Sequence, residues 1–250
     1  MFKTLLARAR QGYRTAGYPA EPPALPPGFR GRPVLDWSKC QPGCTACVDA
    51  CPCDAINLSA GPHLDLGRCI LCGECSKACP TGAVKLSPDW RLAASERAEL
   101  QLSGDTQPHV VALGGELRRL LGRSLRLRQI SAGGCNGCEV EVNALGNVVF
   151  DASRFGIDFV ASPRHADGVL ITGPITQNMR AATLKTYEAV AEPKLVIAAG
   201  ACAISGGIFR GHPEVTDGAD HLFPVDLYIP GCPPHPVTIL DGLLRLLGRL

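Results

Sequence analysis

The sequence predicts two folded units of different class, a small cysteine-rich α+β unit followed by an α/β domain with a parallel sheet. The first unit is indicated by nine of the 13 cysteines, which fall within residues 33–90 in two similar runs. The second is indicated by short apolar runs that alternate with candidate helices over residues 126–250. An arm at residues 1–32 and a linker with some helix at residues 91–125 complete the expected organisation.

The arm is expected to hold one short helix and an extended strap. The stretch MFKTLLARAR can form an amphipathic helix, with its apolar side chains near one face and its basic side chains elsewhere. The following YPAEPPALPPGFRGRP is too rich in proline for the interior of a helix or sheet. We therefore expect an extended strap laid over a partner.

Five apolar runs predict the strands of the α/β domain: LRLRQI, IDFVAS, GVLITG, KLVIAAG and VDLYIPG. Several are continuous rather than alternating, as in a parallel sheet that is covered on both faces. Candidate helices lie at roughly 138–149, 177–191 and 236–248. Alternating strands and helices imply right-handed crossovers, so we expect a flavodoxin-like parallel-sheet domain.

Composition and charge exclude several classes of function. The net charge of +2 does not demand an acidic partner. The basic run RRLLGRSLRLR, from Arg118 to Arg128, has no interleaved aromatic residues, so we expect a solvated helix face or a partner contact rather than nucleic-acid binding. Neither a signal peptide nor an apolar stretch long enough to span a bilayer is visible, which predicts a cytoplasmic, soluble or peripheral chain.

The two cysteine runs have the spacing of ligands to [4Fe–4S] clusters. The second run reads Cys69-x2-Cys72-x2-Cys75-x3-Cys79-Pro80, which is the spacing of bacterial ferredoxins. The first run has one extra residue in its first gap and reads Cys40-x3-Cys44-x2-Cys47-x3-Cys51-Pro52. We therefore expect a bacterial ferredoxin-like α+β unit with two clusters.

In two-cluster ferredoxins the fourth cysteine of each run ligates the other cluster. The first set of ligands is then predicted to be Cys40, Cys44, Cys47 and Cys79. The second set is predicted to be Cys51, Cys69, Cys72 and Cys75. The remaining cysteine of this region, Cys53, has Thr81 as its counterpart and is expected to be a spare buried thiol.

Four more cysteines follow predicted strands of the α/β domain: Cys135, Cys138, Cys202 and Cys232. Loops that follow the strands of a parallel sheet meet at its carboxyl edge, so three distant loops can bring this third set around one more [4Fe–4S] cluster. Flanking glycines let the backbone approach closely and aim N–H groups at the cluster sulfurs. The sequence thus predicts three clusters in total.

Other interpretations of the cysteines remain open. Structural zinc sites also take four cysteines, although zinc knuckles are usually two separated C-x2-C pairs, and a zinc-stabilised scaffold would contain no iron. Buried structural thiols are the alternative for the third set. A stand-alone electron carrier would need no catalytic partner, but it would not need the whole α/β domain either.

Four stretches of the α/β domain resemble the small subunit of formate hydrogenlyase and related group 4 membrane-bound NiFe hydrogenases, within the 20-kDa subunit family of respiratory complex I. They are SAGGCNGCEVEVNAL, FDASRFGIDFVASPRHADGVLITGPIT, GACAISGGIF and VDLYIPGCPPHP. The N-terminal half, with GFRGRPVLDWSKC and the doubled cysteine run, is similar to the two-cluster ferredoxin subunit of the same assemblies. The chain therefore resembles a fusion of two subunits that are usually separate.

The resemblance implies an electron-transfer subunit of an oxidoreductase complex, peripheral on the cytoplasmic face of the inner membrane through partner subunits. It implies a partner large subunit with a Ni–Fe centre, further electron-transfer and membrane subunits, and a position next to that centre for the third cysteine set. Complex I members usually have adjacent cysteines in the first loop, whereas Cys135-x2-Cys138 is similar to the hydrogenase form. A complex I-like subunit that delivers electrons to quinone is the alternative.

A few other side chains near the third set are candidates for a role. Glu139 and Glu141 lie on expected first helical turns, where the helix dipole stabilises a carboxylate. A proton relay is the functional alternative, with Glu141 as its candidate. Arg164 and His165 follow a strand and are expected at the same sheet edge, as tuning, partner-contact or loop-capping residues. His235 stands where arginine is frequent in the related PGCPPRP-type loops.

Overall fold

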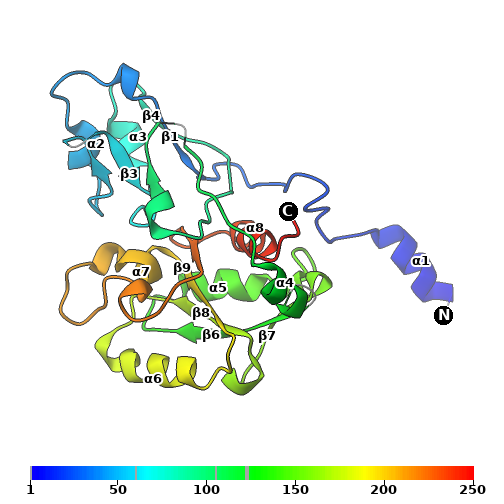
Figure 1. Ribbon diagram of the computed structural model, residues 1–250. Coiled ribbons are helices and arrows are strands. Elements are labelled where there is room, and N and C mark those ends of the chain that lie inside the picture. Colours follow the sequence, from blue (N-terminus) through cyan, green and yellow to red (C-terminus); the bar gives the residue numbers. More distant parts are fainter. Residues whose placement is uncertain (1, 60, 105, 122–123) are drawn as a thin grey trace.

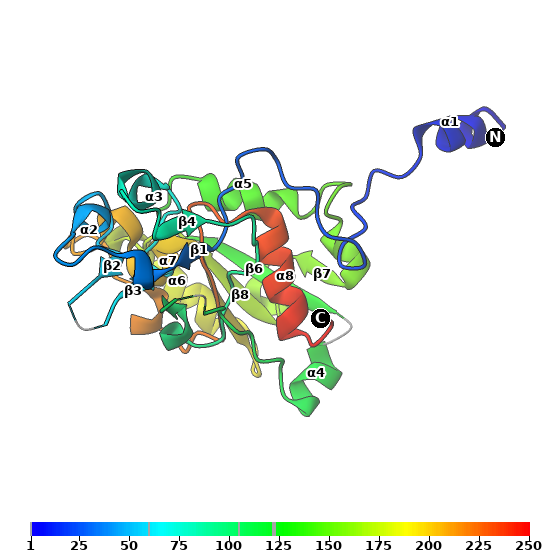
Figure 2. The same ribbon diagram turned by 90° about the horizontal axis from the view of Figure 1, so that it is seen from above.

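The computed structural model describes residues 2–59, 61–104, 106–121 and 124–250 of the chain. In Figure 1 the cysteine-rich part, coloured blue to cyan, lies against one side of a parallel-sheet domain coloured green to red. The N-terminal helix α1 (Phe2–Gln11) projects away from both parts, and the view turned by 90° shows the same separation (Figure 2).

The five predicted apolar runs form one sheet in the order β10-β9-β8-β6-β7, and every neighbouring pair is parallel. Its strands are β6 (Leu125–Ser131), β7 (Ile157–Phe159), β8 (Gly168–Thr172), β9 (Leu195–Ala199) and β10 (Leu227–Ile229). Counted along the chain within this sheet, the order is 2-1-3-4-5, which is that of the flavodoxin-like fold. The predicted fold class of this domain is confirmed.

Helices cover both faces of the sheet because its strands are apolar on both faces. Leu170 packs into a core with α5 (Gly137–Ala144) and α8 (Pro236–Leu246). Its neighbours Val169 and Ile171 point to the opposite face and share a core with α6 (Gln177–Glu188) and α7 (Ala201–Ser205). The C-terminal helix α8 is almost wholly buried, as expected for a helix that packs on the sheet.

The predicted helices differ from the observed ones mainly at their ends. The helix expected at 138–149 ends at Ala144, because the chain turns at Gly146 instead of continuing the apolar pattern into Val148, which is exposed. The helix α7 was not predicted, since five residues are too few to show a helical period.

The cysteine-rich part contains two small antiparallel sheets and two short helices. One sheet pairs β1 (Pro33–Leu35) with β4 (Val84–Leu86). The other joins β2 (Ile56–Asn57), β3 (His63–Asp65) and β5 (Gln101–Leu102). The helices are α2 (Ala46–Asp49) and α3 (Glu74–Ala78), which lie side by side in both views (Figures 1 and 2).

The segment 91–125 connects the two parts by pairing with each of them. Its strand β5 belongs to the sheet of the cysteine-rich part, and Ala94 forms an antiparallel bridge with Tyr228 of β10. It also contains the helix α4 (Gly115–Leu121). Short 3-10 turns are η1 (Trp37–Lys39), η2 (Arg97–Leu100), η3 (Ala152–Phe155), η4 (Pro163–His165), η5 (Gly207–Phe209) and η6 (Ala219–His221).

One hydrophobic core runs from the cysteine-rich part into the sheet. Leu64 and Leu102 of the small sheet belong to the same buried cluster as Ile171 of β8 and Ile204 of α7. A buried hydrogen bond of 3.0 Å from Ser205 Oγ to the carbonyl of Gly67 adds a polar link. The shared core holds the two parts in a defined relative position.

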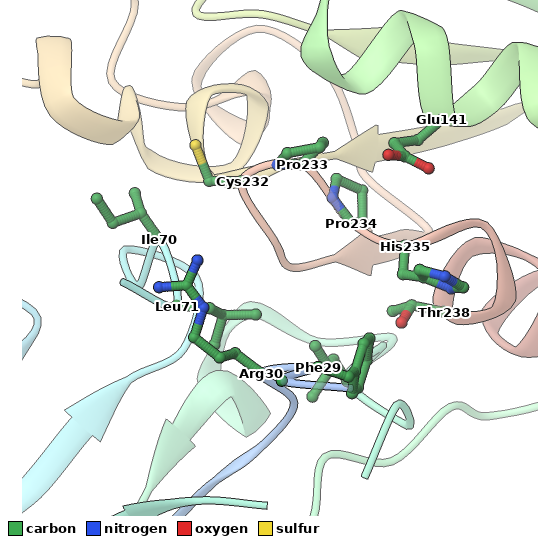
Figure 3. Close-up of a pocket in the computed structure, with 12 residues that line it drawn as sticks. Phe29, Arg30, Ile70, Leu71, Glu141, Cys232, Pro233, Pro234, His235 and Thr238 are labelled. Carbon is green, nitrogen blue, oxygen red and sulfur yellow. The ribbon is translucent and has the colours of Figure 1, made fainter. Parts of the chain in front are cut away.

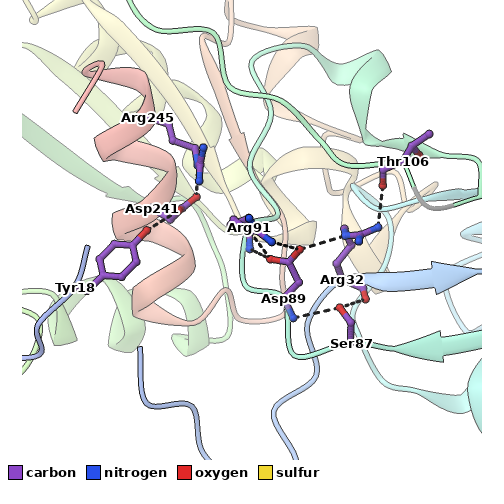
Figure 4. A network of polar contacts seen from close by, with 8 residues as sticks. All are labelled: Tyr18, Arg32, Ser87, Asp89, Arg91, Thr106, Asp241 and Arg245. Atoms are coloured by element: carbon purple, nitrogen blue, oxygen red, sulfur yellow. Dashed lines mark hydrogen bonds and ion pairs between the residues drawn. The ribbon is translucent and has the colours of Figure 1, made fainter. Parts of the chain in front are cut away.

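The strap that follows α1 lies over the chain's own C-terminal domain. The buried Tyr18 hydroxyl donates a 2.5 Å hydrogen bond to Asp241 of α8, and Asp241 also pairs with Arg245 at 2.8 Å (Figure 4). Further along, the carbonyl of Arg32 accepts a bond from Ser87, and the side chain of Arg32 lies 3.5 Å from Asp89 (Figure 4).

The basic run Arg118–Arg128 is divided between two elements. Arg118 and Arg119 lie in α4, Arg126 and Arg128 lie in β6, and residues 122–123 fall outside the described part of the chain. The expected solvated helix face therefore covers only the first part of the run.

None of the helices in the described ranges is both long and apolar enough to cross a membrane.

Candidate metal centres

Two short helices position the cysteines of the doubled run. Each helix begins after the second cysteine of its run and carries the third, so Cys47 lies in α2 and Cys75 lies in α3. Both thiols are buried, with exposed fractions of 5% for Cys47 and 8% for Cys75. The helices pack against each other, which brings the two halves of the repeat together.

The fold brings the cysteines of the first set close to one another. Burial raises the pKa of the Cys47 thiol, and the thiols near enough to add to this rise are Cys40, Cys79 and Cys44. Cys79 comes from the other half of the repeat, as the exchange of fourth ligands requires. The distance along the chain is closed by the contact between α2 and α3.

The second set is grouped in the same way. Burial is the main cause that raises the pKa of Cys69, and the neighbouring thiols that contribute are Cys75, Cys51 and Cys72. Burial also raises the pKa of Cys75 to about 11. Buried thiols with high pKa values remain protonated until a cation compensates the thiolate, and iron supplies that compensation.

Backbone N–H groups point at matching sulfurs in the two halves. The N–H of Ala55 donates to Cys51 Sγ at 3.3 Å, and the N–H of Ala83 donates to Cys79 Sγ at 3.2 Å. Burial acts against ionisation of Cys79, but N–H groups and the Thr81 hydroxyl outweigh it and lower the pKa of Cys79 to about 7. Donors of this kind stabilise thiolates and raise the potential of a bound cluster.

The third set lies at the carboxyl edge of the five-stranded sheet. Cys135 and Cys138 follow β6, Cys202 follows β9 in the first turn of α7, and Cys232 follows β10. In this sheet order the chain leaves β6 toward one side and β8 toward the other, so the loop after β6 lies at the topological switch point where open α/β sheets bind ligands. Burial raises the pKa of Cys138, and Cys202, Cys232 and Cys135 are among the neighbours that add to it.

The glycines beside the third set leave room for sulfur. A Cβ atom at Gly200 would lie 2.5 Å from Cys138 Sγ, and one at Gly207 would lie 2.9 Å from Cys202 Sγ. Both glycines have positive φ, at 93° and 58°. The cradle therefore requires glycine at both positions, and its four thiols are the donor set of a [4Fe–4S] cluster. The residues present fit such a group.

No three Cys, His, Asp or Glu side chains in the described ranges converge as ligands of a single metal ion would. A cubane takes one thiolate on each of its four irons, so its ligands surround a group instead of meeting at a point. All 13 cysteines are free thiols.

Glu139 is a buried structural carboxylate. Its Oε1 atom accepts hydrogen bonds from Ser131 Oγ at 2.7 Å and from Thr172 Oγ1 at 2.8 Å, which join α5 to the ends of β6 and β8. The side chain is 7% exposed. This role goes beyond the expected interaction with the helix dipole, and only the fold could show it, because the two partners come from adjacent strands.

Glu141 lies instead on a cavity of about 250 Å³ between the cysteine-rich part and the third set (Figure 3). Phe29 and Arg30 of the strap, Leu71 of the second run and Cys232 also line this cavity. Burial raises the pKa of Glu141 above its ordinary value. The buried hydroxyl of Thr238 lines it too, and no partner for its Oγ1 is found within the described residues.

His235 caps helix α8 at the edge of the same cavity. Its Nδ1 accepts a 3.2 Å hydrogen bond from the N–H of Val237, so the proton of the neutral ring is on Nε2. The ring stands edge-on to Phe29 and Phe150, at centroid distances of 5.5 and 5.9 Å. Burial lowers the pKa of His235 below its ordinary value of 6.5.

We expect this cap to make stability depend on pH. An imidazolium has no lone pair to accept from Val237, so the native protein resists protonation while the unfolded chain takes up its proton at about pH 6.5. Stability should rise with pH from the lowered pKa up to 6.5 and level off above it, by about 1 kcal/mol in total. His235→Asn keeps a capping acceptor that does not titrate, and thermal unfolding across this range should lose the slope. An unchanged slope in the variant would contradict this assignment.

Two expectations about other residues have different outcomes. Cys53 is buried, with 7% exposure, as expected. Arg164 and His165 were expected at the cysteine edge of the sheet, and this is wrong. They lie in η4 after β7, which ends level with Leu127, and Asp167 accepts from the N–H of Arg126 at the start of β6. Because β7 is short, this exposed turn lies at the opposite, amino end of the sheet.

Two family comparisons match the two parts of the chain. Residues 135–246 match the family described as NADH ubiquinone oxidoreductase, 20 Kd subunit. Residues 62–85, which include the second cysteine run, match the 4Fe-4S binding domain. The chain therefore contains sequence typical of 4Fe-4S cluster binding in each part.

Three curated proteins are similar to the chain over its C-terminal region. Formate hydrogenlyase subunit 7 of Escherichia coli is 45% identical over 141 residues, 56% of this chain and 55% of that protein. A probable membrane-bound hydrogenase subunit of Pyrococcus furiosus is 42% identical over 54% of this chain and 81% of its own length. A subunit of the NADH-quinone oxidoreductase of Carboxydothermus hydrogenoformans is 51% identical over 45% and 69%. The chain thus spans little more than half of the first of these relatives.

Proposed function

Because the chain belongs to the family of the NADH ubiquinone oxidoreductase 20 kDa subunit, preceded by a 4Fe-4S binding domain, we propose that it is the electron-transfer subunit of a multisubunit NiFe hydrogenase. In this proposal the Ni–Fe centre belongs to a partner large subunit. The three cysteine sets hold three [4Fe–4S] clusters, each of which takes up and releases one electron at a time. The complex is held on the cytoplasmic face of the membrane.

The arrangement of the three sets in a row is the observation that carries the proposal. Cys75 of the second set has Cys47 of the first set among its electrostatic neighbours. On the other side Cys53, next to Cys51 in the chain, neighbours both Cys72 of the second set and Cys232 of the third. The second set therefore lies between the other two, as a chain of electron carriers requires.

A complex I-like subunit that delivers electrons to quinone is the second candidate. The 51% identity to the NADH-quinone oxidoreductase subunit favours it. Against it stands the first loop of the third set, where Asn136 and Gly137 separate two cysteines that are usually adjacent in complex I subunits. Asn136 has a φ of 70° and begins α5, so the separation changes where the two thiols stand on the helix.

Glu141 is our candidate for a proton-transferring group beside the third set. Its partial burial, its raised pKa and its position on the cavity that Cys232 also lines support this role. Glu139 lacks this access because Ser131 and Thr172 occupy its inner oxygen. A carboxylate with a raised pKa exchanges protons more readily near neutral pH than an ordinary one.

Anaerobic capture of the native complex through a tag on this chain tests the proposal. We expect about twelve irons per chain, from three clusters of four, together with nickel in the bound partner. In the same preparations Glu141→Gln should lower hydrogen evolution at least tenfold with the iron content unchanged, and Glu141→Asp should recover part of it.

Other results would lead to other functions. Iron without nickel, with a signal that responds to quinone, would move the chain to the complex I-like candidate. Zinc in place of iron would overturn the assignment of all three sets. Migration as a lone monomer from mild native extracts would favour a stand-alone carrier, and full activity of Glu141→Gln would remove Glu141 from proton transfer.

A further inference from the structure

The N-terminal helix α1 presents an apolar face to solvent. Phe2, Leu5 and Leu6 have exposed fractions of 75%, 61% and 44%, and no residue of the helix is buried. Phe2, Leu5, Leu6 and Ala9 follow the spacing i, i+3, i+4 and i+7, so they lie on one side of the helix. A face of this kind is stable only when something covers it.

The charge around that face has a single sign. Residues 2–20 contain four basic side chains and no acidic one, and the first acidic residue is Glu21. The basic residues are Lys3, Arg8, Arg10 and Arg14. Tyr13, which is 86% exposed just after the helix, stacks against the guanidinium of Arg8 at 4.4 Å. The segment therefore combines an apolar face, a cationic remainder and an aromatic residue at its end.

The helix is held away from the body on a short tether with a firm base. The N–H of Ala16 donates to Val149 at 2.9 Å, and Arg154 donates to the carbonyls of Ala16 and Tyr18 at 2.9 and 2.8 Å. The buried bond from Tyr18 to Asp241 completes this base (Figure 4). Only residues 12–15 separate the base from the helix, which projects from the molecule in both views (Figures 1 and 2).

We propose that α1 is a membrane-surface anchor that lies flat in the interface of an anionic lipid bilayer. The apolar side chains would enter the acyl boundary, and the basic side chains would face anionic headgroups. A short cationic amphipathic helix binds such a surface weakly by itself, so it fits an orienting role for a subunit that is also held by partners. Because the tether is short, the anchor would set the height of the cysteine-rich part above the bilayer.

Co-sedimentation of the full-length chain with vesicles tests this proposal without requiring electron-transfer activity. We expect binding to vesicles of phosphatidylglycerol and phosphatidylcholine, and much weaker binding to phosphatidylcholine alone or at high salt. Leu5→Glu with Leu6→Glu should abolish binding. Arg8→Gln and Arg10→Gln should each weaken it about fivefold, because one basic residue near an anionic surface contributes about that factor.

Val111→Glu is the matched control, since Val111 is a similarly exposed aliphatic residue, at 55%, on the body of the molecule. It should bind vesicles like the unchanged chain. Equal binding to neutral and anionic vesicles, or unchanged binding of the Leu5, Leu6 double variant, would overturn the proposal. If the chain ignores vesicles but the double variant is lost from the purified complex, the helix docks on a protein subunit and the membrane proposal is wrong. None of these results depends on whether the complex is a hydrogenase.

Discussion

Cys75→Ser is expected to remove one cluster, whereas Cys53→Ser is expected to leave all clusters in place. The two thiols are equally buried, with exposed fractions of 8% and 7%, and they lie in the same small part of the chain. They differ in their neighbours, because Cys75 lies among Cys51 and Cys72 while Cys53 faces the gap toward Cys232. Loss of Cys75 should cost about four irons per chain and abolish electron transfer through the second set.

Iron analysis and low-temperature electron paramagnetic resonance of the anaerobically purified proteins measure this difference. Each variant places a hydroxyl in a buried site, so both should lose a similar amount, about 1–3 kcal/mol, of packing and solvation energy. Any difference in iron therefore comes from ligation and not from general destabilisation. If Cys53→Ser loses as much iron as Cys75→Ser, Cys53 is a ligand and the grouping of the second set must be revised.

Gly200→Ala is expected to eliminate the third cluster while the other two persist. A Cβ atom there would lie 2.5 Å from Cys138 Sγ, so the thiol would have to leave its place. The backbone at Gly200 has φ 93° and ψ 152°, a region that essentially only glycine occupies, which adds about 1–3 kcal/mol of strain. We expect loss of about four irons per chain and at least a hundredfold loss of hydrogenase activity, because the set nearest to the proposed partner would be empty.

Gly211→Ala separates the effect of space from the effect of backbone strain. Gly211 also has a positive φ, at 79°, but a Cβ atom there would meet nothing within 4 Å. It should lower the free energy of unfolding by a comparable amount and keep its full iron content. Thermal unfolding and iron analysis of both variants make the comparison. Retention of all iron by Gly200→Ala would show that Cys138 does not need the position described here.

The strands of the α/β domain were accessible from sequence, but their order was not. Runs such as GVLITG and KLVIAAG are apolar at successive positions, which indicates burial on both faces wherever the strand lies. Nothing in a run identifies its neighbour in the sheet. The order 2-1-3-4-5 follows from how the helices pack on the two faces, and that packing places the loop of Cys135 and Cys138 at the switch point.

The same limit explains the error at Arg164 and His165. The rule that loops after parallel strands share one edge holds for strands of similar length and level. The strand β7 has only three residues and pairs with the first half of β6, so its end does not reach the edge where β6, β9 and β10 end. Strand length and register come from pairing, which the local sequence does not encode.

The sequence by itself determined the two-part organisation, the apolar strands and the grouping of cysteines within each run, because those depend on spacing along a few residues of chain. The tertiary structure alone decided the row in which the three sets lie, the buried bonds of Glu139 and the exposure of α1. These depend on contacts between residues far apart in the chain, such as Glu139 with Thr172 and Tyr18 with Asp241. Such contacts form only when hydrophobic burial has selected one arrangement of the elements.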